Sequence, residues 1–172
     1  MHASIVPIGR PDAGLLHSLV EGLAGAGFEA ALDGPEKIPV RAHDPSRGQY
    51  LADAFLAPLR RHGGERVLGV TDVDLYVEGL NFVLGLAESR GRVAVISLAR
   101  LGAEVDRDRA GARALKEAVH EIGHTLGLGH CPDPGCVMHF SNCLADTDRK
   151  SARFCAACRA RVRRPLSPDG TR

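Results

Sequence analysis

Three histidines and a glutamate are spaced so that they could hold and use a metal ion. His120 and His124 are four residues apart, which places them on one face of an α-helix, where each ring can offer a nitrogen to the same ion. Glu121 lies about 100° further round the helix, so it can flank the ion without binding it. Gly127 permits the left-handed turn that ends a helix, and His130 can then return as a third ligand. Three protein ligands leave a fourth zinc position open for water, as in a catalytic site.

Four cysteines form a second set with metal-ligand spacing. Cys131 and Cys136 are separated by four residues, and Cys155 and Cys158 form a C-x-x-C pair. Two short-spaced pairs match a tetrahedral site of four thiolates, so we expect a structural zinc ion there. A rubredoxin-like iron, disulfides and free thiols are the alternatives. The odd number of cysteines and the lack of a signal-peptide pattern argue against disulfides, and we expect the fifth cysteine, Cys143, to be a buried thiol.

The two predicted sites are joined by a peptide bond, because His130 and Cys131 are neighbours. Loss of the metal bound by the cysteines should therefore loosen the loop that holds His130. A structural zinc ion would also supply folding energy to roughly 45 residues that carry few apolar side chains.

A helix over residues 108–126 must position the histidines. Its apolar residues recur at the spacing of a buried stripe, and they are Leu115, Val119, Ile122 and Leu126. On a helical projection His120 and His124 fall on the side opposite this stripe. We expect the helix to bury its aliphatic face and to present its histidines to a cleft.

The rest of the chain alternates between predicted strands and helices. Apolar runs and helical spacing predict strands at 3–8, 28–32, 66–71, 81–87 and 92–99, and helices at 12–26 and 49–62. Prolines mark 35–48 as a loop, and the cysteine-rich segment after the last helix shows no obvious regular structure. This order predicts an α+β fold with a mixed, twisted sheet of about five strands, not a doubly wound parallel sheet.

The composition is that of an ordinary globular protein. With 172 residues, 44% hydrophobic and 25% charged, the chain predicts one domain with a real core. We expect this domain to span 1–164, with subdomains 1–127 and 128–164, and a flexible tail at 165–172. The net charge of +1 indicates no nucleic-acid or membrane partner. The N-terminus shows no secretory signal and no room for a propeptide, so we expect a cytoplasmic protein, and a monomer.

The motif H-E-x-x-H-x-x-G-x-x-H, followed by Met138, resembles the metzincins, a clan of zinc metallopeptidases. The spacing of the cysteines around Met138, with the later C-x-x-C, is similar to the archaemetzincin family. Residues 69–76 and 81–87 also resemble that family, so the resemblance extends from about residue 66 to 158. It implies a compact metzincin-like domain in which the active-site helix precedes a zinc-stabilised C-terminal subdomain. It also implies that Met138 forms a hydrophobic base, the Met-turn, beneath the catalytic zinc.

The resemblance implies a zinc-dependent peptidase with two zinc ions per chain. Zinc held by the three histidines would lower the pKa of its bound water toward ~7, and Glu121 would accept the proton as water attacks a peptide carbonyl. A peptide substrate could add a strand to a sheet edge, at 81–87 or 92–99. Some members of the family are described as aminopeptidases, and such an activity needs a group that binds the α-amine. The acidic candidates are Asp72, Asp74 and Glu78, although a solvated turn explains them equally well.

Two other functions keep most of the same residues. A peptide-binding protein with little turnover would retain both metal sites. A zinc-stabilised interaction module would use only the cysteine site, so it would bind one metal ion per chain instead of two. The intact Glu121 favours catalysis over peptide binding alone.

Overall fold

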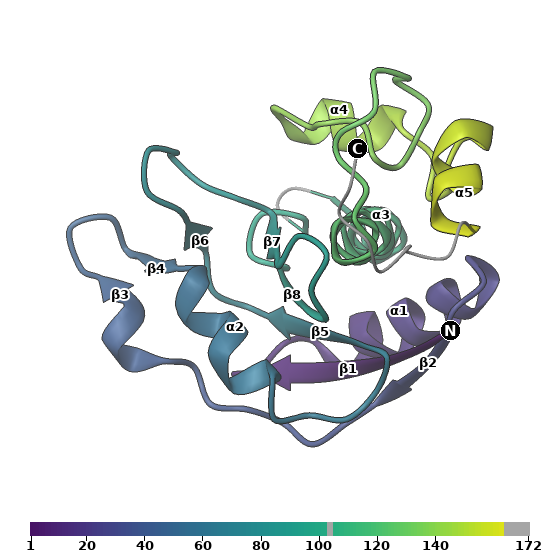
Figure 1. Ribbon diagram of the computed structural model, residues 1–172. Coiled ribbons are helices and arrows are strands. Elements are labelled where there is room, and N and C mark those ends of the chain that lie inside the picture. Colours follow the sequence, from purple (N-terminus) through teal and green to yellow (C-terminus); the bar gives the residue numbers. More distant parts are fainter. Residues whose placement is uncertain (103–104, 164–172) are drawn as a thin grey trace, which may run out of the picture.

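A mixed five-stranded sheet forms the centre of the molecule (Figure 1). The computed structural model describes residues 1–102 and 105–163, so the predicted tail at 165–172 lies outside the described residues. The strand order across the sheet is β2 (Glu29–Leu32), β1 (His2–Ile8), β5 (Arg66–Thr71), β8 (Val93–Ser97) and β7 (Gly85–Ala87). The first four strands are parallel, and β7 runs antiparallel to β8. The predicted mixed sheet is confirmed.

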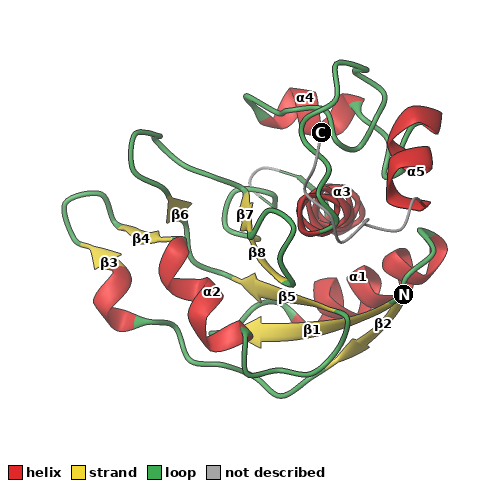
Figure 2. Cartoon of the chain, in the orientation of Figure 1, coloured by secondary structure: helices red, strands yellow, loops and turns green. Residues whose placement is uncertain are grey.

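Helices cover both faces of this sheet (Figure 2). Helices α1 (Ala13–Gly25) and α3 (Arg107–Thr125) pack on one face, and α2 (Asp53–Leu59) packs on the other. The central strands β5 and β8 are therefore buried on both sides, which explains their nearly continuous apolar sequences. Alternate residues enter the two cores, since Leu68 contributes to the core beneath α3 and Val67 to the core beneath α2.

A second, three-stranded sheet extends the molecule beyond α2. Its order is β3 (His43–Asp44), β4 (Gln49–Leu51) and β6 (Leu75–Tyr76), and the 3-10 helix Val40–Ala42 precedes it. Both the predicted helix at 49–62 and the predicted loop at 35–48 are thus partly wrong. Strand β4 forms because Tyr50 N donates to Asp74 O and Ala52 N donates to Tyr76 O, both at 2.9 Å. These partners lie more than twenty residues away, where local periodicity cannot register them.

The C-terminal segment contains two short helices, α4 (Leu144–Arg149) and α5 (Ala156–Arg163). The expectation of no regular structure there is wrong. Short helices gain little from their own hydrogen bonds, and α4 instead depends on contacts with α3, where Arg113 donates two hydrogen bonds of 2.7 Å to Asp148. Helix α3 consequently lies between the sheet and the C-terminal segment (Figure 1).

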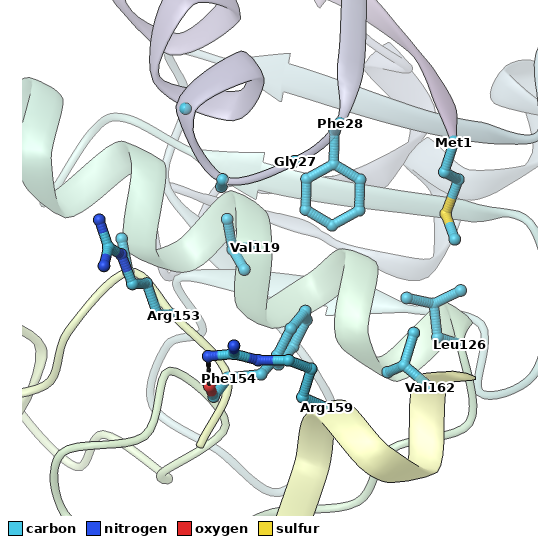
Figure 3. Close-up of a pocket in the computed structure, with 12 residues that line it drawn as sticks. Met1, Gly27, Phe28, Val119, Leu126, Arg153, Phe154, Arg159 and Val162 are labelled. Carbon is cyan, nitrogen blue, oxygen red and sulfur yellow. Dashed lines mark hydrogen bonds between the residues drawn. The ribbon is translucent and has the colours of Figure 1, made fainter. Parts of the chain in front are cut away.

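The apolar stripe predicted for α3 is buried unevenly. Val119 and Ile122 are each 1% exposed, whereas Leu115 and Leu126 are only half-buried. Val119 and Leu126 line a cavity of about 390 Å³ that also has Phe28 and Phe154 in its walls (Figure 3). None of the helices within residues 1–102 and 105–163 is both long and apolar enough to span a lipid bilayer.

Candidate metal centre and active site

Helix α3 and the turn after it bring three histidines together. His120 and His124 lie one helical turn apart, with their ring centroids separated by 4.6 Å. The helix ends at Thr125, and Gly127 follows with a φ of 82°, which glycine adopts without strain. The chain then returns His130, so that one ring nitrogen from each histidine lies within 4.8 Å of the others. The three residues predicted as metal ligands therefore converge.

The hydrogen bonds of two of these rings determine where their lone pairs point. His120 Nδ1 lies 2.8 Å from Val137 O, and His124 Nδ1 lies 2.8 Å from Leu128 O. A carbonyl oxygen only accepts, so Nδ1 donates in both rings and a neutral ring has a bare Nε2. Burial lowers the pKa of His120 to about 3 and also lowers the pKa of His124, which keeps both rings neutral.

The two bare nitrogens face each other. His120 Nε2 and His124 Nε2 are 3.0 Å apart, a distance at which two lone pairs repel unless a cation lies between them. A tetrahedral zinc ion with Zn–N bonds of about 2.05 Å would place two such nitrogens roughly 3.3 Å apart. The donor set and its geometry therefore fit a zinc ion, with the backbone carbonyls holding the rings in the required tautomer.

Glu121 lies beside the histidines and is only 6% exposed. Its side chain rests on the backbone of Gly85 in β7, where a Cβ atom would lie 2.7 Å from Glu121 Cγ. Burial raises the pKa of Glu121 well above the usual value, and the negative charge of Glu117 raises it further, while the charge of Lys150 lowers it. A carboxylate with a raised pKa takes up a proton more readily, as a general base requires.

A cavity of about 500 Å³ opens in front of these four side chains. Its other wall is the edge strand β7 together with residues 77–84, and Phe140 lies beside His130 with a ring-centroid distance of 4.8 Å. Of the two strand edges predicted to bind substrate, 81–87 lies at the cavity. The prediction that 92–99 offers such an edge is wrong, because β8 is paired on both sides, by β5 and by β7.

The four predicted cysteine ligands also converge. All five cysteines fall within the described residues and are free, so no disulfide competes with a metal. The four sulfur atoms lie within 4.8 Å of one another, and Cys131 Sγ and Cys155 Sγ are 3.9 Å apart, close to the roughly 3.8 Å expected in a tetrahedral zinc–thiolate site. A hydrogen bond from the backbone of Cys158 lowers the pKa of Cys155 to about 7, whereas burial raises the pKa of the Cys136 and Cys158 thiols. Cys143 is exposed, so the expectation of a buried thiol is wrong.

Met138 lies between the two sites and is fully buried. Its carbonyl accepts a hydrogen bond of 2.9 Å from Cys131 N. The preceding carbonyl, of Val137, is the one that holds His120. The segment around Met138 therefore contacts one ligand of each predicted metal site.

The acidic candidates for binding a substrate amine lie elsewhere. Asp72 accepts a hydrogen bond from Arg10 N, and both oxygens of Asp74 are occupied by Arg100. Glu78 is exposed, and none of the three candidates lines the cavity.

Three residues beside the site were not predicted from the sequence. Glu117 lines the cavity one turn before Glu121, and a buried ion pair of 3.0 Å joins it to Lys150. The i, i+4 spacing of the two glutamates was a signal for Glu117. Phe140 and Lys150 reach the site only through tertiary contacts, and the sequence carries no local signal for them.

The comparisons with known proteins point to one family. The model of peptidase family M54 matches residues 46–164. An archaemetzincin of Methanopyrus kandleri is 52% identical over 136 residues, covering 78% of this chain and 77% of its own length. An archaemetzincin of Pyrococcus furiosus is 44% identical over 169 residues, covering 90% of this chain and 88% of its own length.

A solved structure shows the same fold. The crystal structure of the archaemetzincin from Methanopyrus kandleri superposes with a TM-score of 0.85 at 42% identity, covering 94% of this chain and 93% of that one. The resemblance inferred from the sequence motifs is thereby confirmed. The chain belongs to peptidase family M54, the archaemetzincins, a family of zinc metallopeptidases.

Proposed function

We propose that this chain hydrolyses peptide bonds with Glu121 as general base and with a zinc ion held by His120, His124 and His130. The observation that carries the proposal is the pair of bare Nε2 atoms 3.0 Å apart beside a buried glutamate. When bound, zinc would lower the pKa of a water molecule toward ~7 and polarise the substrate carbonyl.

Residues of the chain itself move the proton and bind the peptide. Glu121 takes the proton from the attacking water and delivers it to the leaving amine. Gly85 leaves room for the Glu121 side chain against β7. The free edge of β7 lies across the cavity, where an extended peptide can add as a further strand.

A second zinc ion is part of the proposal. Cys131, Cys136, Cys155 and Cys158 would hold it, and residues 128–164 would form a zinc-stabilised subdomain around it. Met138 would be the Met-turn, because its buried side chain lies directly under the helix turn at Gly123, between the two histidine ligands of α3.

An aminopeptidase-like activity is the narrower form of the proposal. It needs a carboxylate that binds the α-amine, and Glu117 and Glu121 are the acidic residues, among those described, that line the cavity. The charge of Glu117 is already offset by Lys150 at 3.0 Å. We therefore favour cleavage within extended peptides, and peptides with free and acetylated N-termini distinguish the two activities.

The test combines metal analysis with a peptide library. We expect two zinc ions per chain, and we expect Glu121→Ala to lower kcat/KM by about 10²–10⁴-fold while keeping both ions. Glu78→Ala is the matched control, because Glu78 is exposed and outside the cavity. Equal cleavage by wild type and Glu121→Ala would refute the general-base assignment. If wild type binds two ions and peptides but cleaves none, the chain is a peptide-binding protein instead.

A further inference from the structure

One wall of the active-site cavity is a segment with little regular structure of its own. Residues 77–84 connect β6 to β7, and six of them line the cavity: Val77, Leu80, Asn81, Phe82, Val83 and Leu84. Its backbone hydrogen bonds are few: Leu80 N donates to Val77 O, Val83 N donates to Leu75 O in β6, and Leu84 O accepts from Ser97 N in β8. Such a segment needs side chains from elsewhere to hold one conformation.

The second sheet provides two of these side chains. Arg47 Nη2 donates to Leu80 O at 2.8 Å and to Asn81 O at 2.9 Å. Gln49 Nε2 donates to the same Asn81 carbonyl at 3.0 Å, and Gln49 itself is 6% exposed. Arg47 is oriented in turn by Gln49 Oε1, at 2.9 Å, and by the ring of Tyr76, 4.4 Å below its guanidinium.

An arginine beyond β8 holds the side chain at the centre of the segment. The Arg100 guanidinium lies 4.1 Å from the ring centroid of Phe82 and donates two hydrogen bonds of 2.7 Å to Asp74. Asp74 also accepts from Gln49 Nε2 at 2.9 Å, so the two anchors form one network. Burial opposes the charge on Asp74, yet the hydrogen bonds from Arg100 and Gln49 outweigh it and lower the pKa of that carboxyl.

We infer that Arg47, Gln49, Asp74 and Arg100 are positioning residues that fix segment 77–84 as an apolar wall of the cleft, and that this wall selects peptides with an apolar side chain beside the scissile bond. The inference rests on the proposed function. None of the four positioning residues lines the cavity, whereas the side chains that do so from this segment are mainly apolar, as in Leu80, Phe82 and Leu84. Phe140 adds an apolar side chain beside the histidines. A wall of this kind discriminates between apolar side chains of different size by roughly 10–200-fold.

The experiment compares two peptides that differ only in having leucine or serine next to the cleaved bond. Wild type should prefer the leucine peptide by at least about tenfold in kcat/KM. Arg47→Met and Arg100→Met should each reduce that preference severalfold, and the change should come from a higher KM for the leucine peptide more than from a lower kcat. Arg100→Lys keeps the charge beside Asp74 but loses the flat contact with Phe82, so it should restore only part of the preference.

Arg60→Met is the matched control, because the Arg60 side chain is 60% exposed and pairs with Glu88 outside the network. If a network variant does not fold, Phe82→Ala tests the same wall directly and should abolish most of the preference. An unchanged leucine-to-serine ratio in folded Arg47→Met and Arg100→Met would overturn the inference while leaving the proposed function standing.

A wild type that cleaves neither peptide would instead contradict the proposed function. In that case the affinities of the two peptides, measured by fluorescence anisotropy, replace the rates. The inference about the wall is supported if wild type binds the leucine peptide more tightly and the variants lose this preference. It is refuted if wild type binds both peptides equally or if the variants keep the preference.

Discussion

Two glycines allow close packing around the candidate active site, one beneath Glu121 and one beneath the histidine helix. Gly85 lets the Glu121 side chain lie on the backbone of β7. Gly123 stands between the two histidines of α3, where a Cβ atom would collide with Met138 Sδ and lie 3.0 Å from Phe154 Cε1. One of the nominally variable positions of the H-E-x-x-H motif is therefore constrained in this chain by the packing beneath the helix.

Gly123→Ala should destabilise the protein even though alanine is the better helix former. The added methyl group overpacks the contact with Met138, at a cost of about 1–3 kcal/mol, and we also expect lower activity because Met138 must move. Gly111→Ala is the control on the same helix, since a Cβ there meets its first neighbour at 3.9 Å and should add up to ~1 kcal/mol of stability. Urea unfolding of the metal-loaded proteins measures the free energy of unfolding of both variants. An equal change in this free energy for Gly123→Ala and Gly111→Ala would contradict the packing argument.

At the scale of elements, predictions from the sequence succeeded where the deciding signals are local. Helix α3 was predicted at 108–126 and spans Arg107–Thr125, because Asp106 caps its first turn and Gly127 ends its last. The strand at 66–71 is confirmed with both ends, since a buried apolar run is bounded by glycines and a turn. The histidines converge as predicted for the same reason, because their spacing is short, and the spacing within each cysteine pair is short as well.

The prediction failed where a distant partner decides the structure. Residues 49–51 have helical spacing but form β4, because β6 offers them backbone hydrogen bonds. Helices α4 and α5 were missed because α3 and the cysteine cluster support them. The apolar wall at 77–84 and its anchor Arg47 lie more than thirty residues apart in the sequence, so no local pattern could relate them.

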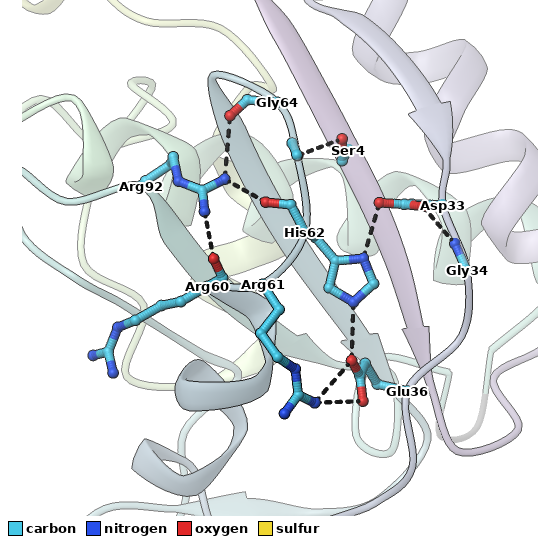
Figure 4. A network of polar contacts seen from close by, with 10 residues as sticks. Ser4, Asp33, Gly34, Glu36, Arg60, Arg61, His62, Gly64 and Arg92 are labelled. Carbon is cyan, nitrogen blue, oxygen red and sulfur yellow. Dashed lines mark hydrogen bonds and ion pairs between the residues drawn. The ribbon is translucent and has the colours of Figure 1, made fainter.

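Hydrogen bonds and ion pairs of charged side chains hold the end of α2 in place (Figure 4). Arg92 donates to the backbone oxygens of Arg60 and His62 at 2.8 and 2.7 Å, which satisfies carbonyls at the helix end. The His62 ring lies between Asp33 Oδ2 at 2.9 Å and Glu36 Oε1 at 3.1 Å. The connection that follows β2 is thereby tied to α2.

This contact predicts a pH-dependent contribution to stability. Burial opposes the charge on His62, but Asp33 and Glu36 outweigh it and raise the pKa of the ring above 6.5. The stabilisation is therefore fully present below about pH 6.5 and is lost as the pH rises through the raised pKa of the folded state. His62→Gln should cost about 1 kcal/mol at pH 5.5 and less at pH 8.5.

Urea unfolding at a series of pH values measures this difference between wild type and variant. His17→Gln is the control, since the His17 ring is exposed and lies 2.7 Å from a carbonyl of its own helix. A His62→Gln effect that stays constant or grows with rising pH would show that the ring is not the protonated partner.

At the scale of the whole molecule, α3 belongs to both halves of the structure. Its apolar residues pack on the sheet, and three polar residues on the two turns before the histidines hold the C-terminal segment. Arg113 pairs with Asp148, Lys116 donates to the carbonyls of Thr147 and Asp148, and Glu117 pairs with Lys150. The segment that carries the cysteines is thus attached to the helix that carries two of the three histidines.

The Glu117–Lys150 pair should be the most costly of these contacts to break, because both side chains are almost fully buried, at 5% and 1% exposed. Lys150→Met leaves the Glu117 charge without its partner in the interior, so we expect a loss of about 3–5 kcal/mol. Glu117→Gln combined with Lys150→Met removes both charges and should recover much of that loss. The exposed pair of Arg107 and Asp12 is the comparison, where Arg107→Met should cost no more than ~1 kcal/mol. Urea unfolding of the metal-loaded proteins measures the free energy of unfolding of the wild type, the single variants and the double variant. If the double variant is as unstable as Lys150→Met alone, the loss comes from lost packing between α3 and the C-terminal segment and not from an unpaired charge.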